Sequence, residues 1–591
     1  MTTGRSETAA EARTLTEALL IQGESRPDFR WLTLLDSSEK EHPLTFGGLL
    51  ENGRKTAHSL EEYGVKAGDP VILILPTSLE FLYVYWGILL LGAIPVPLYP
   101  PVRINELDRY SSQLQAIVKN SCAQIIVTFP VMRRMFRWAV RPSERSVSIV
   151  DAEALLTTGM GGRKDEPGSS HHTALIQYTS GSTGKPKGVE LTHENLLSHI
   201  RSVARTLDYS PEDVGVSWLP LYHDMGLIGA ILSTLVYAIP LVLLSPVDFI
   251  KSPRRWLRAV HRYRGTLSAA PNFAYSLCTR KVRDRDIEEM DLSSWRVAIN
   301  GAELIHHRTL VEFADRFAAA GFSRKAFMPA YGLAEATLAV SFTPVDEAPV
   351  IRSYARKTFE LEGRAVPVPD SDPEAVRWVS VGRPIPDHLV KIVNSFDTAV
   401  PDRLVGEVTV QGPSVMKGYY LQPDITSDVL RGGWLYTGDL GFVDEGQLFI
   451  TGRIKDLIVR GGKNVYPHDI EESVSSVAGV RPGCVSAFGI PHIEQGTEEI
   501  IVVAETRIRS SARTGRMVQE IRKKVKEDTG CSPDRVILVP PGTVAKTSSG
   551  KIQRYLCRER YLGGEFSRPR RGGVWKRIGF WLRFLTAFNS K

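Results

Sequence analysis

The chain has 591 residues, 43% hydrophobic and 24% charged, which is the composition of a globular protein with more than one domain. Its net charge of +7 does not indicate a nucleic-acid channel, because residues 563–591 carry seven basic residues and one acidic residue and leave the rest nearly neutral. Five widely spaced cysteines and a start without a signal-peptide pattern exclude a disulfide framework and predict a cytoplasmic protein.

Two long uncharged runs, residues 81–102 and residues 225–247, raise the question of a membrane span. Prolines interrupt both runs, and a proline ends a helix because it lacks the N–H donor and clashes with the preceding turn. We therefore expect each run to form a buried helix followed by a buried strand.

Short apolar runs alternate with helical patterns through the first part of the chain, as in residues 71–75 before residues 78–91. This alternation predicts βαβ units and an α/β fold with mixed or parallel sheets. From about residue 350 the pattern changes to strands with turns, which predicts a β-rich subdomain. After Arg453 an α/β pattern resumes and predicts a small α+β domain over residues 454–562.

The change of pattern predicts a large N-terminal domain over residues 1–453 and an interdomain hinge at Lys455. Residues 346–378 are polar, rich in proline, and interrupt the core pattern like an insertion. Within them, residues 354–368 combine strand-forming residues with a glycine turn at Gly363. We expect a small hairpin docked against the C-terminal domain, and a surface loop is the alternative.

A loop rich in glycine, hydroxyl and lysine residues, "TSGSTGKPKG" (179–188), follows a predicted buried strand at residues 174–178. Glycines let backbone N–H groups curl around an anion, hydroxyls add donors and lysines add charge, so the loop predicts a phosphate site. It is not a Walker A loop, because Pro186 stands where that pattern needs Gly-Lys-Ser/Thr. A flexible linker is the alternative. The candidate residues are Thr179, Ser180, Gly181, Ser182, Thr183, Gly184 and Lys187.

Two further motifs follow predicted strands, where open α/β sheets leave room for a planar ligand. In "YGLAEAT", Tyr331 offers a ring face to a base, Gly332 permits close approach, and Glu335 is a carboxylate suited to a hard cation. The second motif, "NGAE", consists of Asn300, Gly301, Ala302 and Glu303.

Three single residues complete the candidate set. Asp439 in "YTGDLG" is placed to accept both hydroxyls of a ribose, although an aspartate before a turn is often only a turn former. Arg453 lies beside the predicted hinge, and Lys551 lies on a second Gly/Ser loop, "KTSSGKIQR".

In their order and spacing, over residues 15–562, these motifs resemble the adenylate-forming superfamily of acyl-CoA synthetases, peptide-synthetase adenylation domains and luciferases. Within it the sequence looks most like the fatty acyl-AMP ligases. The motifs that carry this resemblance are "QYTSGSTGKPKGVELTH", "WLPLYHDMGLIG", "APNFAY", "AYGLAEATL" and "VYPHDIE".

The resemblance implies that ATP and Mg²⁺ are used and that a carboxylate attacks the α-phosphorus, giving an acyl adenylate and pyrophosphate. The loop would hold the β- and γ-phosphates, Lys551 would stabilise the developing charge, and Glu335 with Thr179 would bind Mg²⁺. Asp439 and Arg453 would hold the ribose. The adenine would be framed by Asn300, Gly301, Ala302, Glu303, Tyr331 and Gly332, and the small domain would swing about Lys455.

The same resemblance places His223 of "YHDMG" near the reacting carboxylate, although a structural histidine is the alternative. The apolar helix that follows could wall an acyl tunnel, but simple core packing would give the same pattern. The candidate acyl-pocket residues are Met225, Gly226, Ile228 and Phe273. One departure from the family pattern is Ala545, where relatives usually carry proline.

Three interpretations of the protein's function remain. A fatty acyl-AMP ligase would pass a medium- to long-chain acyl group to the phosphopantetheine thiol of a separate acyl carrier protein or of a polyketide or nonribosomal synthase. An acyl-CoA synthetase would use CoA, and a non-catalytic regulator would only bind adenylate. The insertion at 346–378 favours the first reading, and retention of Lys551, Glu335, Asp439 and Arg453 argues against the third. Chain length, acceptor and oligomeric state stay open.

The tail, residues 563–591, carries apolar residues at helical spacing among basic ones, which is typical of a helix that lies on a membrane surface. We expect peripheral contact with a membrane or another acidic surface. A docked or disordered tail is the alternative. The apolar positions are Ile578, Trp581, Leu582, Leu585 and Phe588.

Overall fold

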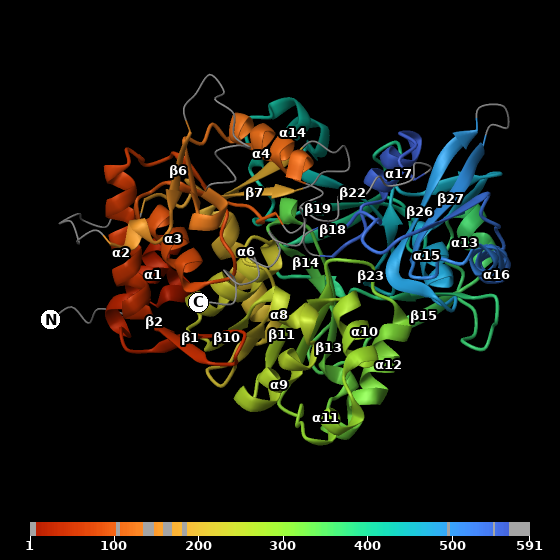
Figure 1. Ribbon diagram of the computed structural model, residues 1–591, viewed down its shortest axis with the longest axis horizontal. Coiled ribbons are helices and arrows are strands. Elements are labelled where there is room, and N and C mark those ends of the chain that lie inside the picture. The colour runs from red at the N-terminus through yellow and green to blue at the C-terminus, as the bar shows by residue number, and fades with distance from the viewer. Residues whose placement is uncertain are drawn as a thin grey trace.

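The structure is a computed structural model, shown in Figure 1. It describes residues 8–101, 107–133, 147–157, 168–179, 186–492, 497–547 and 550–566. The loop candidates Ser180, Gly181, Ser182, Thr183 and Gly184 lie outside these ranges, as does the tail beyond residue 566.

The largest sheet has nine strands and carries the ends of the motifs singled out above. Its order is β17 (Arg383–Pro384), β14 (Ala339–Phe342), β13 (Phe327–Gly332), β12 (Val297–Gly301), β11 (Leu267–Pro271), β9 (Gly215–Ser217), β10 (Leu241–Leu244), β1 (Arg30–Leu35) and β2 (Glu41–Thr45). Neighbouring strands are parallel from β1 through β10, β9, β11 and β12 to β13. At the two ends of the sheet the pairings β1–β2, β13–β14 and β14–β17 are antiparallel. The predicted α/β fold class is confirmed.

Two smaller sheets belong to the same N-terminal part. One is a parallel sheet of β4 (Ile94–Pro97), β3 (Pro70–Leu73), β5 (Ile125–Thr128) and β6 (Ser148–Asp151). The other consists of β20 (Gly418–Tyr419), β8 (Lys187–Thr192) and β7 (Thr173–Thr179). The helices packed with these sheets include α1 (Leu15–Ser25), α2 (Phe46–Glu62), α4 (Leu107–Ser121), α6 (His193–Leu207), α10 (Asn272–Lys281) and α12 (His307–Phe317).

Both uncharged runs are buried helices followed by buried strands, as predicted. The first forms α3 (Leu79–Leu90) and then β4. The second forms a π-helix (Met225–Leu232), continues as α7 (Ser233–Val236), and ends in β10. Over the residues that the structure describes, no helix combines the length and the apolar character needed to cross a membrane.

The predicted change to strands and turns is present after residue 350. An antiparallel sheet contains β18 (Leu389–Val393), β19 (Gly406–Gln411), β22 (Trp434–Asp444), β21 (Leu430–Arg431) and β23 (Gln447–Arg453), with the short helix α14 (Pro423–Val429) beside it.

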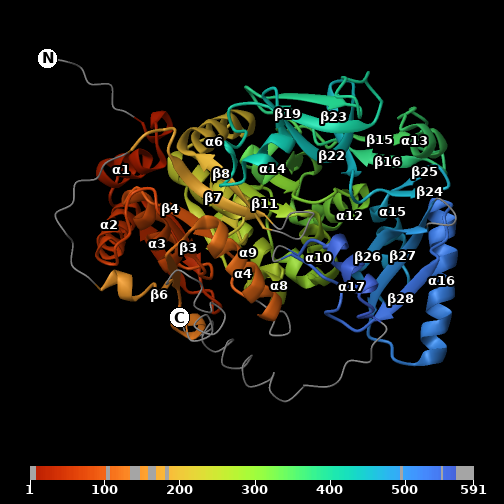
Figure 2. The ribbon, with the colours of Figure 1, turned by 90° about the horizontal axis from the view of Figure 1, so that it is seen from above.

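The C-terminal elements, β24 to β28 with α15 to α17, gather on one side of the molecule in both ribbon views (Figures 1 and 2). They are β24 (Ile458–Arg460), β25 (Lys463–Val465), α15 (Pro467–Ser475), β26 (Val480–His492), β27 (Thr497–Thr506), α16 (Ser511–Thr529), β28 (Arg535–Val539) and α17 (Arg554–Leu562). They bury their own apolar clusters, such as the one around Val485, Val502 and Ile521. The domain boundaries at 453 and 562 stay predictions.

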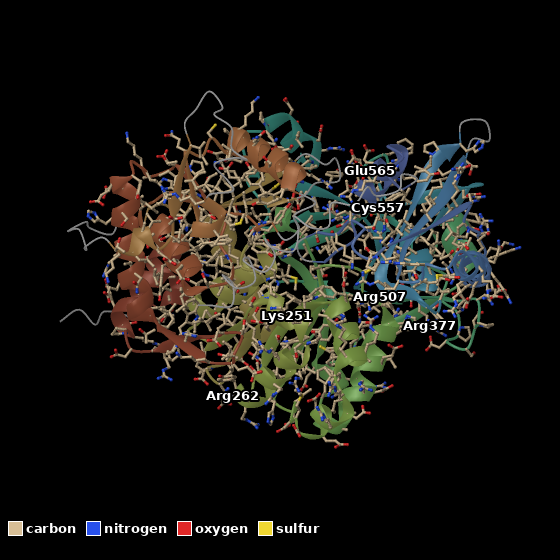
Figure 3. All side chains as sticks on the ribbon, viewed as in Figure 1. Lys251, Arg262, Arg377, Arg507, Cys557 and Glu565 are labelled. Carbon is tan, nitrogen blue, oxygen red and sulfur yellow. The ribbon has the colours of Figure 1, made fainter. Side chains whose placement is uncertain are left out.

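The predicted hairpin within residues 354–368 is wrong. Tyr354 does form an isolated antiparallel bridge with Pro367, but α13 (Arg356–Glu362) lies between them, and β15 (Ile351–Tyr354) forms its ladder with β16 (Val376–Val379). The reason lies in "RKTFELE", which is rich in helix formers, and in Gly363, whose φ of 63° caps the helix rather than turning a hairpin. Figure 3 shows Arg377 of β16 on the side that the C-terminal elements occupy.

The segment does pack against the C-terminal elements. The rings of Phe359 and Tyr466 are 5.7 Å apart, and Arg356 Nη1 lies 3.9 Å from Asp469 Oδ2 of α15. Figure 1 places α13 near α15, and Figure 2 shows it next to β25. The contact surface that was predicted is therefore present, although a helix forms it.

Candidate active site

A cavity of about 2150 Å³ lies between the N-terminal sheets and the C-terminal elements. It brings together most of the residues selected from the sequence, although they are spread over more than 370 positions from Thr179 to Lys551. The candidates that line it are Thr179, Lys187, His223, Met225, Phe273, Gly301, Ala302, Glu303, Tyr331, Gly332, Glu335, Asp439, Arg453, Lys455 and Lys551. Asn300, Gly226 and Ile228 are not among its lining residues.

The floor of the cavity is formed where the parallel strands β12 and β13 end. Backbone space is limited here, because a Cβ added to Gly332 would lie 1.8 Å from the carbonyl oxygen of Leu338. Ala302 follows β12 with a φ of 67°, a conformation that few side-chain-bearing residues adopt. The chain thus turns sharply at both strand ends and leaves an opening above them.

Asn300 supports this floor from below. Its side chain is fully buried, and its Nδ2 donates to Asn272 Oδ1 at 3.3 Å. Asn272 in turn donates from Nδ2 to Thr309 Oγ1 at 3.2 Å, which ties β12 to α10 and α12. Asn300 therefore holds the strand end in place and does not reach the cavity itself.

The buried residues Tyr331 and Asp439 form one network with the exposed Arg453. The Tyr331 hydroxyl donates to Asp439 Oδ2 at 2.7 Å, and Arg453 Nε donates to Asp439 Oδ1 at 2.9 Å. Asp439 and Arg453 are direct partners across β22 and β23, so the strand register sets their pairing. The negative charge of Asp439 raises the pKa of Arg453, which stays a cation at the cavity wall.

Glu303 faces the same cavity from the turn after β12. Its Oε1 accepts a hydrogen bond of 2.6 Å from the backbone N–H of Phe273. Burial raises the pKa of Glu303, and this hydrogen bond together with the charge of Lys551 opposes the rise. Lys551, from a loop of the C-terminal elements, therefore lies close enough to act on a carboxylate of the central sheet.

Lys551 also faces a pair formed by His223 and Asp224. His223 Nδ1 lies 2.5 Å from Asp224 Oδ1, and the N–H of Met225 donates to Asp224 Oδ1 at 2.7 Å. Burial would raise the pKa of Asp224, but His223 and Lys551 outweigh it and lower that pKa to about 2. Burial lowers the pKa of Lys551, while the charge of Asp224 opposes that shift. Asp224 was not selected from the sequence, and its only signal was its position beside His223.

The loop that carries Lys551 rests on Phe273. A Cβ added to Gly550 would lie 3.2 Å from Cε1 of the Phe273 ring, and the φ of Gly550 is 93°. Only glycine combines this backbone conformation with so close an approach. Phe273 therefore lines the cavity on one side and supports the Lys551 loop on the other.

The apolar part of the cavity runs along the π-helix. Its walls include Met225, Gly229, Ala230, Phe273 and Leu338. Ile228 is fully buried in the main core, and a Cβ added to Gly226 would lie 2.2 Å from the Pro220 carbonyl oxygen, so these two residues serve packing. One-turn π segments often occur at functional sites.

Glu335 and Lys187 meet at a residue that sequence reasoning missed, Tyr419. The Tyr419 hydroxyl donates to Glu335 Oε1 at 2.9 Å, and Lys187 Nζ lies 4.7 Å from the centre of the Tyr419 ring. Thr179 and Lys187 are partners across β7 and β8, so the two ends of the phosphate loop open at this point of the cavity. Burial lowers the pKa of Lys187, and the nearby charge of Lys455 lowers it further.

Comparison with known proteins gives concordant matches. The family described as AMP-binding enzyme matches residues 21–420. The medium-chain-fatty-acid–[acyl-carrier-protein] ligase JamA of Moorena producens (strain JHB) is 36% identical, and the match covers 94% of this chain and 96% of that protein. The long-chain-fatty-acid–AMP ligase FadD26 of Mycobacterium marinum is 32% identical, with 94% and 98% covered.

A solved structure from a study of fatty acyl-adenylate ligases of E. coli and L. pneumophila resembles the whole fold. It superposes with a TM-score of 0.88 at 32% sequence identity and covers 95% of this chain and 100% of its own. The large N-terminal part, the β-rich sheet and the C-terminal elements thus correspond to one known arrangement.

Proposed function

The chain belongs to the family of AMP-binding enzymes, and from this premise we propose that it is a fatty acyl-AMP ligase. It joins the carboxylate of a medium- to long-chain fatty acid to the α-phosphate of ATP and releases pyrophosphate. The observation that carries the proposal is that Lys551 shares one cavity with Glu335, Asp439, Arg453 and an apolar wall.

The nucleotide is assigned to the polar half of the cavity. Asp439 and Arg453 hold the ribose hydroxyls, and the pairing of these two residues fixes their side chains before ATP arrives. The Tyr331 ring and the backbone of residues 301–303 frame the adenine, and Gly332 lines the same cavity and lets the chain pass close to the Leu338 carbonyl. Thr179 and Lys187, with the loop between them, hold the β- and γ-phosphates.

The reaction needs positioning and charge neutralisation, and no protein nucleophile. A carboxylate oxygen attacks the α-phosphorus, a P–O bond forms, and the bond to the departing pyrophosphate breaks with its electron pair. Lys551 stabilises the negative charge that gathers at this point, and the charge of Asp224 counters the fall in the pKa of Lys551 that burial causes. His223 lies beside the reacting carboxylate, held by Asp224.

The residues present fit a Mg²⁺ ion that arrives with the nucleotide. Glu335 offers one carboxylate and Thr179 one hydroxyl, and the described residues hold no cluster of three or more His, Cys, Asp or Glu that would make a metal cage. Mg²⁺ commonly binds through one or two carboxylates, substrate phosphates and water. When bound, it would neutralise phosphate charge.

The acyl group is then passed to a phosphopantetheine thiol of a separate carrier protein or carrier domain. For this step we propose that the C-terminal elements rotate about Lys455, which withdraws Lys551 and opens a path to the acyl carbonyl. The contacts of α13 with Asp469 and Tyr466 support the idea that the inserted segment holds the C-terminal elements in the arrangement used for adenylation. Holding that arrangement disfavours transfer of the acyl group to CoA. Peripheral membrane contact through residues 563–591 is part of the proposal.

One assay tests the central proposal. The protein is given ATP, Mg²⁺ and fatty acids of increasing chain length, and acyl-hydroxamate and pyrophosphate are measured, first alone and then with CoA or a holo carrier protein. We expect hydroxamate with medium or long chains and thioester only with the carrier. Thioester with CoA alone would establish an acyl-CoA synthetase, and no hydroxamate with any acid would support an adenylate-binding regulator.

A further inference from the structure

Tyr419 occupies an unusual place between two parts of the site. It lies on β20, which pairs antiparallel with β8, so its backbone is fixed opposite Val189. The segment from residue 418 to residue 419 is thereby joined to a strand more than 200 positions earlier in the chain. Its side chain lines the cavity, and only 6% of the residue surface is exposed.

One side chain contacts both an anion and a cation of the site. The hydroxyl donates to Glu335 Oε1 at 2.9 Å, which leaves the second carboxylate oxygen to face other partners. The ring face, which carries negative charge density, receives Lys187 Nζ at 4.7 Å from its centre. Among the described residues, Glu335 and Lys187 form no direct salt bridge, so Tyr419 holds them apart as well as in place.

The backbone under Glu335 is fixed independently. The N–H of Met416 donates to the Glu335 carbonyl oxygen at 2.8 Å. Thr337, with a φ of 70°, donates from Oγ1 to the carbonyl oxygen of Ser414 at 2.6 Å, and the Ser414 hydroxyl contacts the Ala336 carbonyl oxygen at 3.1 Å. The peptide turn therefore keeps its position, and the remaining freedom of Glu335 lies in its side chain.

We infer that Tyr419 is a positioning residue that sets the distance between the metal-binding carboxylate of Glu335 and the phosphate-binding ammonium of Lys187. The inference rests on the proposed function of these two residues. The hydroxyl selects one orientation of the Glu335 carboxylate, and the ring selects one position of Lys187, so metal and phosphates are received in a fixed relation. Preorganisation of this kind improves binding because fewer rotamers must be ordered when the ligand arrives.

Two substitutions separate the two contacts. Tyr419→Phe keeps the ring under Lys187 and removes only the donor to Glu335, whereas Tyr419→Leu removes both. Binding of Mn²⁺ in the presence of a non-hydrolysable ATP analogue is followed by electron paramagnetic resonance, and binding of the analogue alone is followed by calorimetry in EDTA. We expect Tyr419→Phe to weaken Mn²⁺ binding about tenfold, because one hydrogen bond to a charged group is lost. Binding of the ATP analogue without metal should be unchanged in this variant. Tyr419→Leu should weaken both.

A matched control is the neighbouring Tyr420→Phe, because Tyr420 packs against a different apolar cluster, that of Ile72 and Ile126. Its Mn²⁺ binding should equal that of the unaltered protein. Unchanged Mn²⁺ binding in folded Tyr419→Phe would overturn the inference while leaving the proposed function intact. Unchanged Mn²⁺ binding in Glu335→Gln would show that the metal assignment itself fails, and the inference with it.

Discussion

His306 Nδ1 lies 3.1 Å from Glu472 Oε2 and joins the residue that precedes α12 to α15 of the C-terminal elements. Arg308 Nε lies 3.8 Å from the other oxygen of Glu472. Burial alone would lower the pKa of His306, but the hydrogen bond and charge of Glu472, with the charges of Glu303 and Asp469, raise it above 6.5. The same contacts outweigh burial at Glu472 and lower its pKa to about 2.

This pair predicts that docking of the C-terminal elements weakens at alkaline pH. The His306 contribution is fully present below pH 6.5 and is lost as the pH rises through its raised pKa, whereas the Glu472 contribution is present above pH 4.5 and lost only towards pH 2. Energy transfer between one fluorophore on the N-terminal part and one on the C-terminal elements should therefore fall between about pH 6 and pH 9. His306→Gln should flatten this profile, and the exposed His171→Gln should not. An unaltered profile in His306→Gln would contradict the prediction.

Lys551→Ala should abolish acyl-adenylate formation and leave ATP binding largely intact. The charge of Lys551 is needed mainly where negative charge converges in the transition state, a contribution of about 3–4 kcal/mol for a preorganised group. Hydroxamate formation measures the first effect and calorimetry with ATP the second. Lys546→Ala, on the same loop, is the control. Normal hydroxamate formation by Lys551→Ala would remove this residue from the mechanism.

Asp224→Asn should move the alkaline limit of adenylate formation to lower pH. Asp224 is the largest influence opposing the burial that lowers the pKa of Lys551, so its neutralisation lowers that pKa further and Lys551 loses its proton earlier. The pH dependence of hydroxamate formation reports the shift. Asp387→Asn removes an exposed carboxylate paired with Arg205 and should leave the profile unchanged. If both variants share one profile, Asp224 does not tune Lys551.

Arg356→Glu should increase acyl-CoA formation relative to acyl-adenylate formation. The substitution replaces attraction between α13 and Asp469 by repulsion, and we expect a change of about two- to tenfold because partly exposed ion pairs are weak. Lys357→Glu, an exposed change on the same helix, is the matched control. Deleting residues 350–374 would be a poor substitute, since it removes the buried Tyr354 and Phe359 and leaves β16 unpaired.

If Arg356→Glu adenylates normally and still makes no acyl-CoA, the inserted segment does not choose the acceptor. The explanation would then be sought in the lack of a pocket for the CoA nucleotide.

The tail prediction can be tested by flotation. Full-length protein and a form ending at residue 562 are mixed with anionic lipid vesicles and centrifuged. We expect only the full-length protein to float, because the apolar residues Trp581, Leu582 and Leu585 are flanked by basic ones. Equal partitioning of both forms would rule out the membrane contact.

Much of the fold was predictable because its signals are local. Periodicity and the positions of proline and glycine predict the strand ends near Gly301 and Gly332, the two helix-and-strand runs and the α/β pattern after Arg453. The helix α13 was missed because the flanking strand-forming residues and Gly363 suggested a hairpin turn, although "RKTFELE" is rich in helix formers and carries an i to i+4 pair, Arg356 with Glu360.

The missed site residues depend on long-range pairing. Tyr419 reaches Glu335 only because β20 pairs with β8, and nothing near "KGYY" reports this. Asp224 appears in sequence as a neighbour of His223, whereas its influence on Lys551 arises when the C-terminal loop closes over the cavity. Composition and spacing identify the chemical groups, but the partners of each group are set by tertiary contacts.

The contact of Gly550 with the Phe273 ring joins the loop that carries Lys551 to the apolar wall of the cavity. Phe273 lines the apolar wall of the cavity, so the ring that supports the Lys551 loop also borders the space proposed for the acyl chain. Any displacement of the Phe273 ring would therefore also displace the loop that carries Lys551.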